Sequence, residues 1–105
     1  MNSQLKRGVV ELCVMKILSN KSMSTFEVLE SISSDLEINE NTVYPILRRL
    51  TSDSLVEIEK VSDGIGAPRK YFQLSKDGKG KLDSLLTEWN KFIGNVQRIL
   101  GGQNE

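Results

Sequence analysis

The polar residues best suited to form specific contacts lie on one face of a predicted helix between Asn39 and Leu50. Apolar residues in this segment recur at helical spacing and must therefore face a core; they are Val43, Ile46, Leu47 and Leu50. The opposite face carries Asn41, Thr42, Tyr44, Arg48 and Arg49. Hydrogen-bonding groups near a helix start, with guanidinium groups further along, suit a groove lined with base edges and phosphates. The alternative is that both arginines are only solvated charge on a surface helix.

Two segments of the chain match recognisable motifs. Residues Tyr44–Leu50 are similar to the Tyr-Pro-x-Leu-x-Arg-Leu signature of the PadR family of bacterial winged-helix transcriptional regulators. Residues Gly66–Gly78 resemble the wing and the entry to the last helix of the same family. The segments occur in the family's order and separation, and the resemblance extends over nearly the whole chain. The chain resembles the short subfamily and is similar to its multidrug-binding members.

The resemblance implies a mainly α-helical fold with a two-stranded β-wing. We expect a winged helix-turn-helix DNA-binding domain over residues 1–74, then a C-terminal dimerisation helix and frayed tail over residues 75–105, forming one compact unit. The sequence departs from the family at Thr25-Phe26, where Gly-aromatic is usual, and at Ser54, where glycine is common. If position 54 needs a positive φ, serine is strained there.

The charge of the chain is balanced overall but polarised locally. The 14 lysines and arginines equal the 14 aspartates and glutamates, so the whole molecule has no global attraction for a polyanion. Residues 64–81 nevertheless carry five basic residues and one acidic residue, while residues 27–40 carry five acidic residues and no basic one. Local charge would have to drive any DNA binding. The alternative function is a winged-helix protein-interaction module without specific DNA binding.

Several function classes are disfavoured by composition. A single cysteine, Cys13, and the absence of histidine leave no internal disulfide and no usual set of zinc ligands. The sequence has no phosphate-binding glycine loop, nucleophile elbow or credible pair of catalytic carboxylates, so we expect no enzyme and no cofactor. It also has no signal peptide and no apolar run long enough to cross a membrane, which predicts a cytoplasmic protein.

The first three helices have recognisable boundaries. Residues 4–18 predict a helix with a wide apolar surface, and Lys6 and Arg7 at its start are candidate phosphate contacts. Ser24 and Glu27 fit a capping box for a second helix, whose expected buried stripe is Phe26, Leu29, Ile32 and Leu36. Asn39 is the expected cap of the third helix. Pro45 lacks an N–H group, so this helix should begin later or bend.

Two short strands are predicted at residues 55–61 and 69–74, because β-branched and aromatic residues are enriched there. The connection over residues 62–68 contains two glycines and a proline, which is typical of a mobile hairpin tip. Arg69 and Lys70 stand at its return. Beside a helix-turn-helix such a hairpin resembles a wing that contacts the DNA backbone or minor groove, although it could be only a loop.

The last predicted helix begins after a Ser75 cap and runs to about Leu100. Leu82, Leu85, Trp89, Phe92, Val96 and Ile99 follow a coiled-coil spacing, and Leu86, Ile93 and Leu100 form a second row. One small domain cannot easily cover both rows, so we expect a homodimer through this helix. The alternative is a helix folded back on its own domain.

These expectations combine into a dimeric DNA-binding regulator, most simply a repressor of a palindromic operator. Asn41 and Thr42 are candidates for base contacts, and Tyr44, Arg48 and Arg49 for phosphate contacts. Resemblance to multidrug-binding members further implies a pore at the dimer centre for planar aromatic molecules. Its lining, carried over by position, would be Leu5, Leu12, Leu86, Trp89 and Ile93. The alternative is that Trp89 packs in a closed dimer core.

Overall fold

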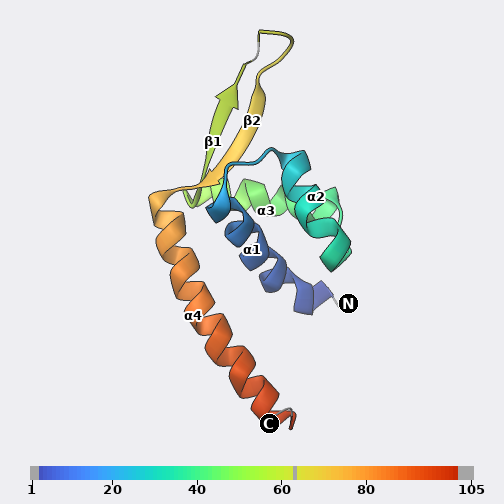
Figure 1. Cartoon of the computed structure of the whole chain (residues 1–105), viewed down its shortest axis with the longest axis vertical. Helices are drawn as coiled ribbons and strands as arrows, with labels where there is room; N and C mark the ends of the chain where they lie inside the picture. The colour runs from blue at the N-terminus through green and yellow to red at the C-terminus, as the bar shows by residue number, and fades with distance from the viewer. Residues whose placement is uncertain (1–2, 63, 102–105) are drawn as a thin grey trace.

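The computed structural model describes residues 3–62 and 64–101, with side chains described from Gly8 onward. The elements in chain order are α1 (Ser3–Asn20), α2 (Thr25–Leu36), α3 (Glu40–Ser52), β1 (Val56–Val61), β2 (Arg69–Leu74) and α4 (Lys76–Ile99). Figure 1 shows α1, α2 and α3 grouped at the centre, with the β1–β2 hairpin projecting from one side and α4 extending away on the other. This confirms a mainly α fold with a two-stranded wing.

Helix α1 supplies the centre of the core. Val10, Val14, Met15 and Leu18 are buried, and Leu12, Cys13 and Ile17 pack against the same cluster from the sides. The wide apolar surface of this segment is explained by its position, because α1 contacts α2, α4 and β2. Burial also raises the pKa of the Cys13 thiol, which favours its neutral form.

The capping box predicted for α2 is confirmed. The Ser24 hydroxyl accepts a hydrogen bond from the Glu27 backbone N–H at 3.2 Å, and Glu27 Oε1 accepts from the Ser24 N–H at 2.9 Å. The hydrogen bond from the Ser24 backbone N–H to the charged carboxylate lowers the pKa of Glu27.

The buried stripe predicted for α2 was wrong in one residue. Phe26 is 68% exposed, whereas Val28 and Ile32 face the core. Residues 28 and 32 are four apart and share a helical face, while Phe26 lies about 200° around the helix from Val28. Which apolar stripe of α2 is buried is therefore decided by its packing on α1 and α3.

Helix α3 forms where its sequence pattern predicts. Asn39 is its N-cap, with Oδ1 accepting from the Asn41 N–H at 2.9 Å. The apolar stripe Val43, Ile46, Leu47 and Leu50 is buried. Of the two outcomes expected from Pro45, a later start or a bend, the later start is excluded, because the helix begins at Glu40 and continues through Pro45. Ser54, just after this helix, has φ 63°, so the left-handed conformation suspected from the sequence is present.

The wing is an antiparallel pair anchored at its base. Val56 pairs with Leu74 near the core, and Val61 pairs with Arg69 toward the tip. Val56, Phe72 and Leu74 are buried, whereas residues 57–61 are exposed. Met23, in the α1–α2 connection, exchanges two backbone hydrogen bonds with Phe72, at 2.9 and 2.7 Å. The base of the wing is therefore fixed to the helical body.

Helix α4 starts at a tightly packed junction. The Ser75 hydroxyl accepts from the Gly78 N–H at 2.9 Å and donates to the Ser54 carbonyl at 2.7 Å. A Cβ at position 78 would collide with the Leu55 carbonyl oxygen, so this position requires glycine. Leu82, expected in a dimer interface, is instead 4% exposed and belongs to the core of its own chain.

Candidate nucleic-acid interface

The polar face of α3 points away from the core. Because Val43 and Leu47 fix the buried side of the helix, Asn41, Tyr44 and Arg48 are exposed and Thr42 is half-buried. Asn41 and Thr42 lie in the first turn, next to the Asn39 cap. The first turn of a helix is the part that enters a DNA groove most deeply in helix-turn-helix proteins. The structure thus places an amide side chain and a hydroxyl side chain in the first turn of α3.

A groove of about 480 Å³ joins this face of α3 to the wing. Tyr44 and Arg48 of α3 line it together with Lys70 of β2. Its floor is apolar, formed by Leu47, Ile58 and Phe72, and Thr25, Thr51 and Ser52 complete the lining. Three of the residues predicted from sequence therefore lie around one concave surface. Asn41, Thr42 and Arg69 lie outside its lining.

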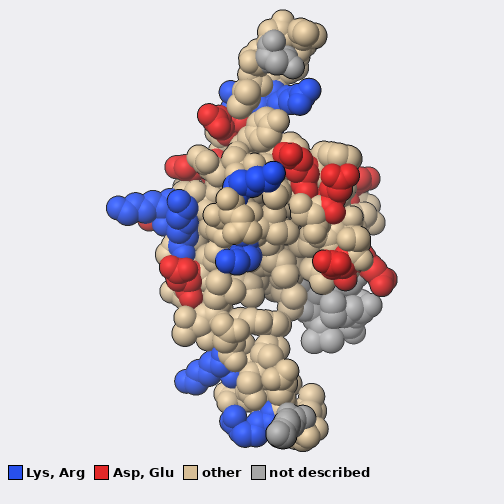
Figure 2. All heavy atoms as spheres, in the orientation of Figure 1, with Lys and Arg blue, Asp and Glu red and all other residues tan. Residues whose placement is uncertain are grey.

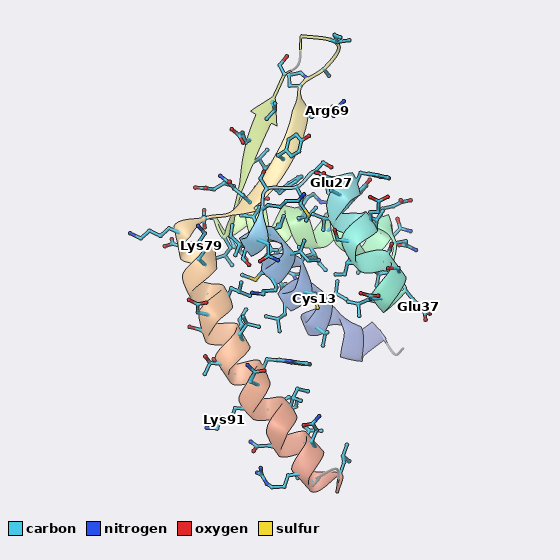
Figure 3. The ribbon with its side chains drawn as sticks, in the orientation of Figure 1. Cys13, Glu27, Glu37, Arg69, Lys79 and Lys91 are labelled. Carbon is cyan, nitrogen blue, oxygen red and sulfur yellow. The ribbon has the colours of Figure 1, made fainter. Side chains whose placement is uncertain are left out.

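The wing carries its positive charge near the start of β2. Arg69 and Lys70 are exposed there, and Figure 3 shows Arg69 on the projecting part of the hairpin. Lys60 pairs directly with Lys70 across the sheet. The sequence patterns had indicated Lys70 but not Lys60. Like charges at opposite positions disfavour each other unless an anion lies between them. Only the pairing register of β1 with β2 places Lys60 beside Lys70, and this register cannot be read from one strand alone.

Charge is distributed unevenly over the surface. Figure 2 shows carboxylates gathered over the side formed by α2, with basic side chains on the wing and at the start of α4. The acidic residues of residues 27–40 are Glu27, Glu30, Asp35, Glu37 and Glu40. Glu40 lies in the first turn of α3 itself, whereas the others lie in α2 or just after it. A polyanion approaching the wing would avoid the acidic side of α2, which favours one orientation of binding.

Arg49 differs from its neighbour Arg48 because it is bound to another helix. Its Nη2 donates to Glu11 Oε2 at 2.6 Å, and its Nε donates to the same oxygen at 3.2 Å. The Glu11 carboxylate raises the pKa of Arg49, so the guanidinium stays charged. This pair connects α3 to α1 across 38 positions of sequence, and no local sequence pattern predicted it.

A second concavity, of about 490 Å³, lies between α1 and α4. We call it the α1–α4 cavity; it is lined by Gly8, Glu11, Leu12, Leu85, Glu88, Trp89 and Phe92. Leu12 and Trp89, predicted as ligand-binding residues, both belong to it. Leu86 and Ile93 do not line it, because they lie on another side of α4, and Leu86 packs against the core. Leu5 lies in α1, as do Lys6 and Arg7, but these three side chains fall outside the described residues.

The outer half of α4 keeps an apolar surface that its own chain does not cover. Phe92 is 61% exposed, Ile99 80% and Leu100 78%. Leu85, Leu86, Trp89, Ile93 and Val96 are half-buried. Figure 1 shows this part of α4 running beyond the helical body. An apolar helical surface of this length is unusual on an isolated small domain.

Within the described part of the chain, the acidic and cysteine side chains form no cluster suited to a metal ion. None of the helices in those same residues is both long and apolar enough to span a bilayer.

A capped helix pair, a third helix with an exposed polar face and an adjoining β-hairpin define a winged helix-turn-helix protein. Residues 14–84, more than half of the chain, match the model of the transcriptional regulator PadR-like family. The chain belongs to this family, and it is therefore a DNA-binding transcriptional regulator rather than an enzyme.

Solved structures support the same assignment. A PadR-like transcription factor from Bacteroides fragilis is 32% identical with a TM-score of 0.79, covering 92% of this chain and 95% of that one. A PadR-like transcriptional regulator from Bacillus cereus is 25% identical with a TM-score of 0.84, covering 96% and 100%. A Lysinibacillus sphaericus protein described as uncharacterized is 26% identical over 91 residues, which are 83% of this chain and 84% of that protein.

Proposed function

We propose that this protein is a homodimeric repressor that binds a palindromic operator through α3 and the wing. The observation that carries this proposal is the groove in which Tyr44 and Arg48 of α3 meet Lys70 of the wing. In the bound state Asn41 and Thr42 contact base edges. Phosphates are held by Tyr44, Arg48, Arg49, Arg69 and Lys70, with Lys6 and Arg7 at the start of α1. A regulator of chromosomal DNA acts in the cytoplasm.

The dimer is proposed from the uncovered apolar surface of α4. Phe92, Ile99 and Leu100 are exposed in the single chain, and association of two copies would remove them from water. A twofold axis would repeat α3 at a spacing of about 34 Å, one turn of duplex DNA, so the operator should be a palindrome. The interface would use Leu85, Leu86, Trp89, Phe92, Ile93, Val96, Ile99 and Leu100.

Release of the operator by a planar aromatic ligand is part of the proposal. Trp89 is half-buried and lines the α1–α4 cavity beside Leu12 and Phe92. Aromatic faces and aliphatic side chains of this kind stack on flat apolar molecules. Trp89 is the sole tryptophan, so quenching of its fluorescence by planar dyes reports binding directly. A closed dimer core would give no quenching with any such dye.

The decisive experiment is selection of duplexes from a random-sequence library, followed by gel-shift titration against unselected competitor. We expect a palindromic consensus, with two half-sites separated by one helical turn. Replacing Asn41 by alanine should relax the preference at one position of each half-site, because a lost base contact costs about 1–3 kcal/mol. Failure to enrich any sequence would favour the protein-interaction module, which the zero net charge supports.

A further inference from the structure

Glu11 belongs to two sites at once. Its side chain lines the α1–α4 cavity together with Trp89, and its carboxylate also accepts both hydrogen bonds from Arg49 of α3. The Glu11 side chain is 29% exposed, so part of it is open to a molecule in the cavity. Figure 1 shows α1 lying between α4 and α2. One acidic group thus connects the cavity with the helix that carries the candidate base contacts.

The chemistry of the cavity indicates what kind of molecule would disturb this connection. Two carboxylates, Glu11 and Glu88, line the same space as the rings of Trp89 and Phe92. Among the described residues that line the cavity, none is a lysine or arginine. A cation is attracted both by carboxylates and by the faces of aromatic rings, most strongly by tryptophan. The cavity therefore suits an aromatic or apolar molecule that carries a positive charge.

We propose that Glu11 couples the cavity to α3, and that a cationic aromatic ligand breaks the coupling by taking the Glu11 carboxylate from Arg49. This inference rests on the proposed role of α3 in DNA binding. Arg49 uses Nε and Nη2 on Glu11, which leaves the other edge of the guanidinium for a phosphate. When the ligand's charge replaces that of Arg49, the arginine loses its fixed orientation and α3 loses a link to α1. Affinity for DNA falls as a result.

The test uses three probes of nearly the same shape: 2-naphthylmethylammonium, 2-naphthylmethanol and 2-naphthoate. Calorimetry on the full chain should show the ammonium binding roughly five- to tenfold more tightly than the alcohol, as a cation–aromatic contact near carboxylates requires. Naphthoate should bind most weakly. Both Glu11→Gln and Glu88→Gln should reduce the preference for the ammonium. Equal binding of ammonium and alcohol to the unaltered chain would overturn the proposal.

The two glutamine variants then separate charge selectivity from coupling. At saturating ammonium, the dissociation constant for a selected duplex should rise at least about fivefold in the unaltered chain, the lower range of typical allosteric coupling. It should rise equally in Glu88→Gln, because Glu88 lines the cavity without contacting Arg49. In Glu11→Gln it should not change. A full response in Glu11→Gln, or the same response to saturating naphthylmethanol, would refute the coupling.

A second measurement does not depend on DNA. The Nε–H resonance of Arg49 in ¹⁵N-resolved NMR spectra reports its hydrogen bond to Glu11. Saturating ammonium should move this resonance toward its position in Glu11→Gln, whereas the alcohol should leave it in place. If no duplex is bound at all, the proposed function fails, but this resonance still decides whether the cavity controls Arg49. An unmoved resonance at saturation would end the proposal.

Discussion

Helices α3 and α4 have similar amphipathic sequences but very different surroundings. Every residue of the apolar stripe in α3 is buried by other parts of the same chain. In α4 the apolar row is fully buried only near its start, at Leu82, while Phe92 and Ile99 are exposed and Val96 is half-buried. An amphipathic pattern therefore marks a surface that must be covered without saying which molecule covers it. The contrast suggests a subunit core in one helix and an interface between subunits in the other.

The largest expected effect comes from breaking the covered stripe. Leu50→Ala should lower the free energy of unfolding by about 2–5 kcal/mol, because Leu50 is almost fully buried and the truncation leaves a cavity. Urea denaturation followed by circular dichroism measures this loss. Phe26→Ala is the matched control on α2, since Phe26 is exposed, and it should change stability by less than about 0.5 kcal/mol. Equal losses in both variants would contradict the assigned core.

A substitution on the uncovered surface of α4 should weaken association between subunits and leave the folding of each subunit intact. Phe92→Glu should leave the subunit folded but weaken dimer association by about 2–4 kcal/mol, because a carboxylate would be placed in an apolar interface. Light scattering measures the change from a two-chain to a one-chain mass. Asn90→Glu adds the same charge at an exposed position two residues away and should not alter the mass. A one-chain mass for the unaltered protein would remove the dimer from the proposal.

The exposed residues of the wing differ from those of α4, because they are expected to contact DNA rather than protein. Replacing Arg69 and Lys70 with alanine should weaken binding to all duplexes and make the logarithmic salt dependence shallower by roughly 1–2 units. Gel shifts at several salt concentrations provide the slope. The control removes two positive charges from α4, Lys91 and Arg98, and should leave the slope unchanged. An unaltered slope in the wing variant would exclude the wing from phosphate binding.

The smallest expected effect concerns the junction between α3 and the wing. Ser54→Gly should raise the free energy of unfolding by about 0.5–1 kcal/mol, because Ser54 has φ 63° and glycine adopts this conformation without a Cβ clash. Ser52→Gly is the control within α3, where the helical conformation gives glycine no advantage and a loss of about 0.5 kcal/mol is expected. Thermal denaturation of the two variants should shift in opposite directions.

Local rules predicted much of the fold. The Ser24–Glu27 capping box, the Asn39 and Ser75 caps and the buried stripe of α3 each depend on residues within one or two helical turns. Both strands were placed to within one residue at each end, because β-branched and aromatic residues end sharply at the glycine-rich connection. A departure from the family pattern at Ser54 raised the question of a positive φ there, and the structure has one.

What sequence could not supply was the relation between distant segments. The exposure of Phe26 and the burial of Leu82 depend on how α2 and α4 pack on α1. The Arg49–Glu11 pair and the α1–α4 cavity join residues far apart in sequence. Glu11 and Glu88 were missed for this reason, since each resembles an ordinary solvated carboxylate when only its neighbours along the chain are considered.

The two backbone hydrogen bonds between Met23 and Phe72 restrict how the hairpin can move. These bonds fix the base of the hairpin to the loop between α1 and α2. Any bending must therefore occur beyond Phe72, toward the glycines at positions 64 and 66, so that the outer part of the hairpin moves relative to a fixed base. Hydrogen exchange should be slow at the Phe72 amide and fast at the Gly66 amide. The distance over which Arg69 can move is set by the length of the hairpin beyond Phe72.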